Sequence, residues 1–410
     1  AALVTMALIA ACAGGAGEQP HQRAKGAATT VLQVLLADDW VTVDAVIHAV
    51  RTFERDHPGV RVQISGAQFS HIPDMALTGG RAGDPVDVAQ WHAFAAGARG
   101  LAEPLDDLWQ GQLSAEEFFP GAVDDVTWAG SRYGVPLDTN VLLLMANSRL
   151  LVERKVKLPE GTYTFADFER VARAVTSGGG DLRGIALPTS TWVAYGWIRA
   201  NGGEIVEVNG TEVRFTLDAP QVVEALGFLG HLIDEGLAFP PVIASSSEDA
   251  YSLFQAGRTA LHLSGMWALV GQEPAGVGRV VLPLPQGARG TTRGTVLGGS
   301  SLYVPRGSPN RELAFEFMLH LASDRYALWL AEEEGRLPTR PRTFDAFVAQ
   351  RPAFATALEQ LRWAGVMRLI AFPEAQAAFD KAVEDIFTGR VEAAVALARA
   401  QQAAQQSTGS

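Results

Sequence analysis

The chain has 410 residues, and its balance of 48% hydrophobic and 19% charged residues excludes an intrinsically disordered protein. A chain of this length exceeds one ordinary hydrophobic core and predicts two lobes of about 150–200 residues each. The formal net charge of −12 argues against a nucleic-acid partner, which would require a basic face.

The only cysteine, Cys12, follows an apolar run over residues 3–11 and precedes small residues. This run is too short to span a bilayer and is typical of an export signal. Residues 9–12, Ile-Ala-Ala-Cys, resemble the lipobox of bacterial lipoproteins, which implies lipidation of Cys12 and attachment to a membrane. We expect residues 13–29 to be a flexible tether and expect further residues before Ala1. A cysteine buried in an N-terminal helix is the alternative.

The first predicted elements alternate between strand and helix. Residues 31–36 form a short apolar run typical of a buried strand, and residues 43–56 place apolar side chains at helical spacing. His57-Pro58-Gly59 ends this helix, and residues 60–64 alternate as a second strand. The order predicts a parallel βαβ unit.

The alternation continues along the chain. We expect strands at 87–89, 184–188 and 259–263 and a helix near 94–98. The Ala-rich residues 374–406 are predicted to be helical, interrupted at Gly389. The fold class is therefore α/β, and no repeat of solenoid period is present.

Short motifs in a fixed order carry a resemblance over about 350 residues. They are, in sequence, Phe53–Val60 with His57-Pro58-Gly59-Val60; Gly83–Val88 with Trp91; Gly100–Leu105; Tyr133-Gly134-Val135-Pro136 with Asn147; Phe254–Leu261 with Gly265-Met266-Trp267; Gly298-Gly299; Ser308-Pro309-Asn310 with Ala314–Phe317; and Gly335–Arg340. Together they resemble the family 1 extracellular solute-binding proteins of bacterial ABC importers, the maltose-binding-protein-like group.

The resemblance implies the type II-like periplasmic-binding-protein fold, in which two lobes hold a ligand in the cleft between them. It implies chain crossings near 138–140, 295–297 and 321–324. Lobe one would then comprise residues 30–138 plus 297–322, and lobe two residues 139–296 plus 323–406. Short linkers at several crossings act as a hinge.

A sugar presents hydroxyl groups on its rim and C–H groups on its faces, so its site needs flat aromatic rings and short polar side chains. The aromatic candidates are Trp40, Trp91, Trp192, Tyr195 and Trp267. Trp40 and Trp91 follow predicted parallel strands, whose carboxyl ends collect ligands. Trp192, Tyr195 and Trp267 match contact regions of the family. Packing in the core is the alternative for each.

Polar candidates lie near the same segments. Asp38 and Asp39 follow the first strand, and Gln68, with Phe69 and Ser70, follows the second. Asp138 lies at the first implied crossing, and Arg340 is a candidate that an exposed surface position would also explain. At Gly298, Gly299 and Ser300 the absence of a Cβ on the glycines would let backbone approach a ligand, or permit a tight hinge turn.

The sequence departs from the family at Leu144-Met145-Ala146-Asn147, where the family often has tyrosines before the asparagine. Maltose therefore cannot be assumed as the ligand. Near the C-terminus Phe372 or Phe379 would replace an inward-facing aromatic residue of the family, although packing explains both.

Sequence patterns of catalysis are missing. The sequence has no HExxH, no GxSxG and no P-loop, and its adjacent carboxylate pairs do not place two acids across a bond. We therefore expect a monomeric binding protein, not an enzyme, without cofactor or metal, which delivers a mono- or oligosaccharide to the transmembrane subunits of an ABC permease. The alternatives are the same fold binding a glycerol-phosphate-type ester or polyol, an extracytoplasmic glycoside hydrolase, and a sensory or adhesion lipoprotein.

Overall fold

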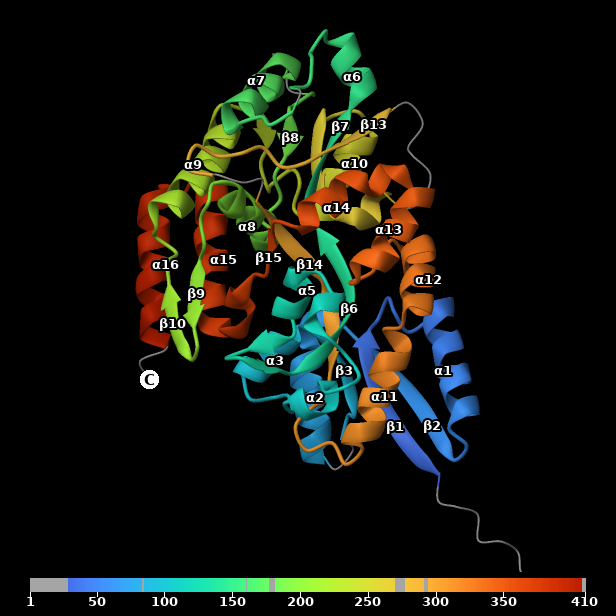
Figure 1. Ribbon diagram of the computed structural model, residues 1–410. Helices are drawn as coiled ribbons and strands as arrows, with labels where there is room; N and C mark the ends of the chain where they lie inside the picture. Colours follow the sequence, from blue (N-terminus) through green and yellow to red (C-terminus); the bar gives the residue numbers. More distant parts are fainter. Residues whose placement is uncertain are drawn as a thin grey trace, which may run out of the picture.

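The computed structural model describes residues 29–82, 85–159, 161–176, 181–269, 277–290 and 294–407. Figure 1 shows two α/β bodies, with β6 and β14 in the middle of the molecule. Cys12 and the predicted tether up to residue 28 lie outside the described residues.

The strands follow in chain order. They are β1 Thr30–Ala37, β2 Val60–Ala67, β3 Val88–Trp91, β4 Thr127–Trp128, β5 Ser131–Arg132, β6 Gly134–Val141, β7 Leu143–Asn147, β8 Ile185–Ala186, β9 Val206–Asn209, β10 Glu212–Phe215, β11 Ala238–Phe239, β12 Leu261–Ser264, β13 Arg279–Leu282, β14 Thr295–Tyr303 and β15 Ala364–Gly365.

The α-helices are α1 Asp44–Asp56, α2 Ile72–Ala82, α3 Ala93–Ala98, α4 Asp106–Trp109, α5 Pro120–Asp124, α6 Ser148–Glu153, α7 Phe165–Val175, α8 Thr191–Ala200, α9 Pro220–Asp234, α10 Ser247–Gln255, α11 Arg311–Leu321, α12 Asp324–Glu334, α13 Pro341–Gln350, α14 Ala355–Leu361, α15 Pro373–Phe387 and α16 Ala393–Ser407. Short 3₁₀ turns are η1 Phe69–His71, η2 Ala115–Glu117, η3 Met266–Leu269, η4 Pro352–Phe354 and η5 Arg368–Ala371.

The sheet of lobe one has the order β15-β14-β3-β1-β2, with β6 also paired to β14. β1 and β2 run parallel, with Thr30 opposite Val60, so the predicted βαβ unit is confirmed. Between them α1 buries Val46, Ala49 and Phe53 on the face that its helical spacing predicted. This topology brings the carboxyl ends of β1 and β3 to one edge of the sheet.

β6 and β14 form the long antiparallel ribbon that connects the lobes. Their pairing runs from Val141 opposite Leu297 to Gly134 opposite Tyr303, with a register shift at Ser300/Ser301. Val141, Leu143 and Met145 belong to one hydrophobic core, together with Leu297, whereas Leu142, Leu144 and Ala146 belong to the other, together with Val296. Successive side chains of this extended segment therefore alternate between the two cores, and the segment is packed between them.

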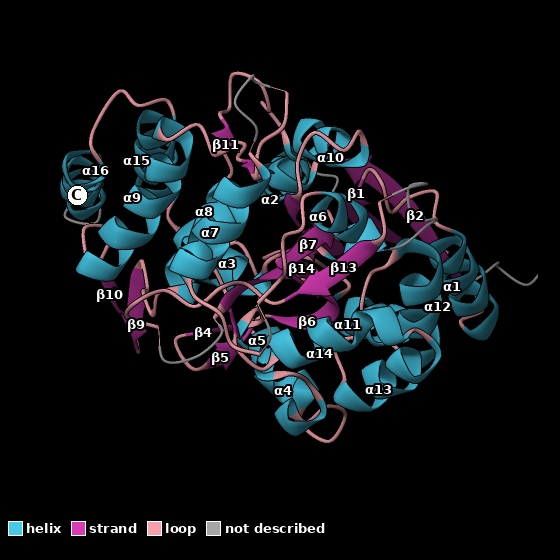
Figure 2. Cartoon of the chain, turned by 90° about the horizontal axis from the view of Figure 1, so that it is seen from above, coloured by secondary structure: helices cyan, strands magenta, loops and turns pink. Residues whose placement is uncertain are grey.

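Lobe two is built on the antiparallel sheet β12-β7-β13 and the parallel pair β8-β11. β8 and β12 correspond to the strands predicted at 184–188 and 259–263. α9, α15 and α16 pack side by side at one end of the molecule (Figure 2). The predicted break in the C-terminal helix is confirmed, because Gly389 follows α15 with a φ of +66°, a left-handed conformation that favours glycine.

α12 follows the third implied crossing, and its contacts are with lobe one. The Tyr326 hydroxyl lies 2.7 Å from Thr52 Oγ1 and 3.1 Å from His48 Nδ1, both on α1. Tyr326 and Leu330 also belong to the core of lobe one. The lobe boundary at residues 322–323 stays a prediction, and these contacts argue for moving it toward the C-terminus.

Candidate ligand-binding cleft

A cavity of about 170 Å³ lies where the ends of β1 and β3 meet the β6–β14 ribbon and the η3 turn of lobe two. Its lining combines three aromatic rings with acidic, amide, hydroxyl and basic groups. These residues are Ala37, Asp39, Trp40, Phe69, Gln90, Asp138, Asn140, Trp267, Gly299, Ser300 and Arg336.

The lobe-one wall is formed by Trp40 and Asp39, directly after β1. Trp40 is buried, and the guanidinium of Arg336 lies over its ring with the guanidinium carbon 4.4 Å from the ring centroid. The same guanidinium donates a hydrogen bond to the Asp39 carboxylate. Arg336 is placed there because α12 ends at Gly335, whose φ of +66° turns the chain back toward the sheet. The positive charge of Arg336 is thus paired within the protein.

The floor of the cavity is a chain of buried hydrogen bonds. The Ser300 hydroxyl donates to Asp138 Oδ1 at 2.5 Å, and Gln90 Nε2 donates to Ser300 Oγ at 2.9 Å. The backbone N–H of Ala37 donates to Gln90 Oε1 at 3.0 Å. These bonds fix the orientation of polar groups on β1, β3, β6 and β14, which is what a pre-organised binding site requires.

Asp138 is the more deeply buried of the two carboxylates. Its burial raises the pKa of its carboxyl group above the usual 3.8, although the charge of Arg336 and the hydrogen bond from Ser300 act in the opposite direction. The cause is the poor solvation of the charged form in a buried site. Asp138 offers acceptor oxygens in its ionised form, and in its protonated form it can also donate a hydrogen bond.

The lobe-two wall is formed by Trp267 on η3, which is 51% exposed. Asn140 Oδ1 accepts hydrogen bonds of 2.8 Å from both Val141 N and Met266 N, so β6 directly positions the turn that carries this tryptophan. The exposed part of this ring is accessible to a ligand, and covering it would remove apolar surface from water.

The ring of Trp192 packs against the ring of Trp267. Their ring centroids are 5.6 Å apart, and Trp192 Nε1 donates to Leu297 O at 3.3 Å. A Cβ at position 298 would lie 3.2 Å from Trp192, so Gly298 leaves room for this ring. Gly299 has a φ of +101°, and a Cβ there would collide with the backbone of Asp138 and Thr139. Gly298 is therefore required for the packing of Trp192, and Gly299 for the backbone conformation of β14.

The structure brings together seven of the predicted site residues in this cavity. They are Asp39, Trp40, Phe69, Asp138, Trp267, Gly299 and Ser300. Trp192 and Gly298 adjoin it through the contacts just described. Asp38 and Gln68 are exposed and do not line the cavity. Asp38 packs instead against Gly66 of β2, where an added Cβ would lie 2.7 Å from Asp38 Oδ1.

Two predicted aromatic residues, Trp91 and Tyr195, are buried away from the cavity. Trp91 packs in the core of lobe one under the guanidinium of Arg99. The Tyr195 hydroxyl donates to the Glu204 carboxylate and to Val366 O, and burial raises its pKa well above 10. Core packing therefore describes Trp91 and Tyr195 better than ligand contact does.

Arg340 is a structural residue of the third crossing. Its Nη1 donates to Ala322 O at 2.7 Å, and its guanidinium lies over the Phe118 ring with Asp324 and Glu117 within 4 Å. Burial lowers the pKa of this guanidinium, while the two carboxylates oppose that shift. We therefore leave Arg340 out of the candidate site.

Sequence reasoning missed three polar lining residues, Gln90, Asn140 and Arg336. Gln90 lies next to a short apolar strand, and its amide side chain was the only signal; Asn140 lies in the implied crossing 138–140, from which Asp138 alone was chosen. Arg336 lies in the quoted motif Gly335–Arg340, from which Arg340 was chosen instead.

Comparison with known proteins decides the family. The model of a family described as bacterial extracellular solute-binding protein matches residues 26–328. The chain belongs to this family. Among its relatives, the galactooligosaccharide-binding protein of Bacillus subtilis is 22% identical over 97% of this chain and 93% of its own length. The diacetylchitobiose binding protein DasA of Streptomyces coelicolor is 26% identical over 82% of this chain and 79% of its own.

Solved structures show the same fold for this solute-binding protein. The ABC substrate-binding protein Lmo0181 of Listeria monocytogenes, in complex with cycloalternan, superposes with a TM-score of 0.79 at 18% identity, covering 93% of this chain and 99% of that one. The sugar-binding protein MalE of Xanthomonas citri gives 0.78 at 20% identity, covering 93% and 98%. The predicted two-lobe α/β fold is confirmed.

Among residues 29–82, 85–159, 161–176, 181–269, 277–290 and 294–407, no three His, Cys, Asp or Glu side chains come together as a metal site would require. Over the same part of the chain, none of the helices has the length and hydrophobicity needed to cross a bilayer.

Proposed function

We propose that this solute-binding protein captures a mono- or oligosaccharide in the cleft and delivers it to the permease of an ABC importer. The observation that carries the proposal is the half-exposed Trp267 facing a hydrogen-bonded set of polar groups that includes Asp138 and Ser300. An aromatic face suits the C–H surface of a sugar ring, and carboxylate and amide oxygens suit its hydroxyl groups. The names of the relatives, which bind galactooligosaccharide and diacetylchitobiose, support a carbohydrate.

Binding and closure, not catalysis, constitute the proposed mechanism. Trp267 belongs to lobe two, whereas Trp40 and Asp39 belong to lobe one, so a ligand that contacts all three favours the closed arrangement of the lobes. A ligand must prefer the closed state by about 5.5 kcal/mol to move the population from 1:99 to 99:1. One aromatic stack and several hydrogen bonds of about 1 kcal/mol each supply free energy of this order.

The charge of the cleft favours a neutral ligand over a phosphate ester. Arg336 is the basic residue of the lining, and its guanidinium is already paired with Asp39. Asp138 adds a second carboxyl group, and Arg340 is held at the third crossing. A phosphate would therefore meet a site whose positive charge is compensated.

The pairing of Asp39 also argues against a glycoside hydrolase. Such an enzyme needs one carboxylic acid and one carboxylate on either side of the scissile bond. Asp39 is bound by Arg336 and Asp138 by Ser300, so each carboxyl group already has a partner within the protein. We propose that the protein releases its ligand unchanged.

The proposed location is outside the cytoplasmic membrane, in keeping with the extracellular family. We propose that Cys12 carries a lipid anchor and that the following residues tether the protein near the permease. The motif Ile-Ala-Ala-Cys supports this anchor. Mass spectrometry of the protein isolated from membranes, with Cys12→Ser as the control, tests it.

The function is tested by a thermal-shift screen of the purified protein against mono- and oligosaccharides, polyols, glycerol phosphates and amino acids. A ligand that binds only the folded state raises the unfolding temperature, and the rise grows with the logarithm of the ligand concentration once this exceeds Kd. We expect one family of sugars to raise it. A response to phosphate esters alone would support the first alternative, and hydrolysis of a glycoside in the same samples would contradict the proposal.

A further inference from the structure

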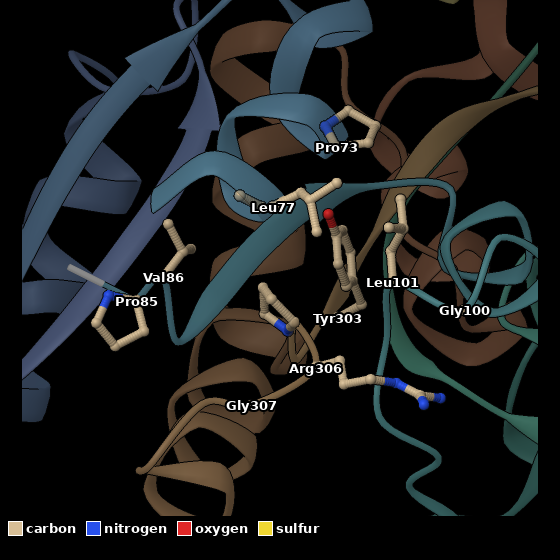
Figure 3. A pocket seen from close by; sticks show the side chains of 11 residues that line it. Pro73, Leu77, Pro85, Val86, Gly100, Leu101, Tyr303, Arg306 and Gly307 are labelled. Carbon is tan, nitrogen blue, oxygen red and sulfur yellow. The ribbon is translucent and has the colours of Figure 1, made fainter. Parts of the chain in front are cut away.

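A second cavity, of about 390 Å³, lies at the other end of the lobe-one sheet (Figure 3). Val86, just before β3, and Tyr303, at the end of β14, line this cavity, whereas Gln90 and Ser300 of the same two strands line the cleft. α2 and the loop after α3 complete the walls with Leu77 and Leu101. Its volume is in the range of small-molecule sites, and none of its lining residues belongs to the cleft.

The walls of this second cavity are mainly apolar and carry no charge into it. Prolines 73, 85 and 305 join the aliphatic side chains in the lining. Arg306 is a lining residue, but its side chain extends away from Tyr303 and the apolar walls (Figure 3). Nearby, Arg99 is hydrogen-bonded to Asp74 at 3.2 Å. A charged ligand would gain no partner here and would lose its hydration.

Tyr303 supplies a buried polar group to the wall of this cavity. The residue is fully buried, and its hydroxyl has no hydrogen-bond partner anywhere in the described part of the chain. Figure 3 shows this hydroxyl between Leu77 and Leu101. A buried donor without an acceptor is unfavourable, and natural structures rarely retain one without a reason. Burial also raises the pKa of Tyr303, so the phenol stays a donor at neutral pH.

We propose that this cavity binds a small neutral molecule with an apolar body and one acceptor oxygen, which accepts a hydrogen bond from the Tyr303 hydroxyl. The apolar body is covered by Leu77, Val86 and Leu101. Leu77 is 39% exposed, so its side chain is the wall that can rotate to admit the acceptor to the hydroxyl. The ligand class is opposite to that of the polar cleft, and the inference does not depend on the proposed function.

Cyclohexanone is a suitable probe because it has an apolar ring, one acceptor oxygen and no donor. Saturation-transfer NMR on the purified protein should show saturable binding in the millimolar range. Leu77→Trp, which fills the cavity, should abolish the signal. Met75→Trp is the matched control, because Met75 is 46% exposed on the same helix and does not line the cavity.

Tyr303→Phe tests the hydrogen bond itself. Its affinity for cyclohexanone should fall about three- to tenfold, the value of one hydrogen bond. Without ligand the variant should unfold at the same temperature as the unchanged protein or higher, because no partner is lost. An absence of saturation transfer in the unchanged protein, or a signal that persists in Leu77→Trp, would overturn the site. Equal affinity in Tyr303→Phe would overturn the assignment of Tyr303.

Discussion

Asp138 shows how one residue of the cleft combines stability and binding. It is 7% exposed, accepts a hydrogen bond from Ser300 and lies near Arg336. Burial raises its pKa in the folded state, so the folded protein holds this proton more tightly than the unfolded chain does. A carboxyl group of this kind lowers the stability of the fold once both states are ionised.

We therefore predict that Asp138→Asn stabilises the protein at neutral pH while weakening ligand binding. Below a pH of about 3.8 the carboxyl group is protonated in both the folded and the unfolded state, and its stabilising contribution to the free energy of unfolding is fully present. This contribution is lost as the pH rises through the higher pKa of the folded state. The stability difference between the variant and the unchanged protein should thus grow with pH. Urea unfolding at several pH values between 4 and 7 measures it, and a difference independent of pH would contradict the burial argument.

The predicted residues that line the cleft share a simple signal. Trp40 and Asp39 closely follow a strand with a clear apolar run, and Trp267 lies in the most distinctive motif. Trp91 does not line the cleft, because adjacent strand residues face opposite ways: Gln90 faces the cleft, and Trp91 packs in the core. Nothing in the local sequence decides which of the two faces the ligand.

At the scale of elements, the β6–β14 ribbon fixes the cleft. We predict that Gly299→Ala destabilises the protein by about 3 kcal/mol, because its φ is +101° and the new Cβ would lie 2.7 Å from Thr139 Cα. Gly59→Ala is the matched control, with a φ of +96° and no atom within 4 Å of the new Cβ. It should cost about 1 kcal/mol from backbone strain alone. Equal losses in denaturant unfolding would show that the ribbon tolerates the extra methyl group.

β12 contributes an acid-sensitive residue to lobe two. His262 is 2% exposed, with its ring centroid 5.2 Å from that of Tyr251 and 5.5 Å from that of Phe254, and burial lowers its pKa from 6.5 to about 3. Because the folded pKa is depressed, the stabilisation is present above pH 6.5 and is lost as pH falls toward 3. This direction is opposite to that of Asp138.

His262→Phe should therefore reduce the loss of stability between pH 6.5 and pH 4. One such group contributes at most about 1.4 kcal/mol per pH unit. Urea unfolding of the variant and the unchanged protein across this range is the measurement. Parallel pH profiles would contradict the argument, because they would mean that His262 has the same pKa in the folded and unfolded states.

The elements themselves were largely predictable because periodic burial produces them. β1, α1 and β2 appear within one or two residues of the predicted bounds wherever apolar spacing was regular, except that the second strand extends to Ala67. The packing of α12 on α1 was not predictable, since it joins Tyr326 to Thr52, 274 residues apart. The same packing of α12 on α1 places Arg336, just after α12, beside Asp39.

At the scale of the whole molecule, the double strand crossing predicts closure about the ribbon. Side chains of residues 141–146 alternate between the two cores, as do those of Val296 and Leu297, so these paired strands connect the packing of both lobes and are the segment about which we expect them to bend. Addition of a bound sugar should reduce the radius of gyration in small-angle X-ray scattering if the free protein is open. An unchanged profile at saturation would contradict hinge closure as the response to ligand.

The central claim is that a carbohydrate is held against Trp267. Isothermal titration calorimetry with the sugar found by the screen tests it directly, using Trp267→Ala and, as control, Trp363→Ala, whose tryptophan is 44% exposed and does not line the cleft. The account predicts a loss of affinity of about tenfold or more for Trp267→Ala, the value of an aromatic contact, and none for Trp363→Ala. Equal affinity in both variants and the unchanged protein would place the sugar elsewhere.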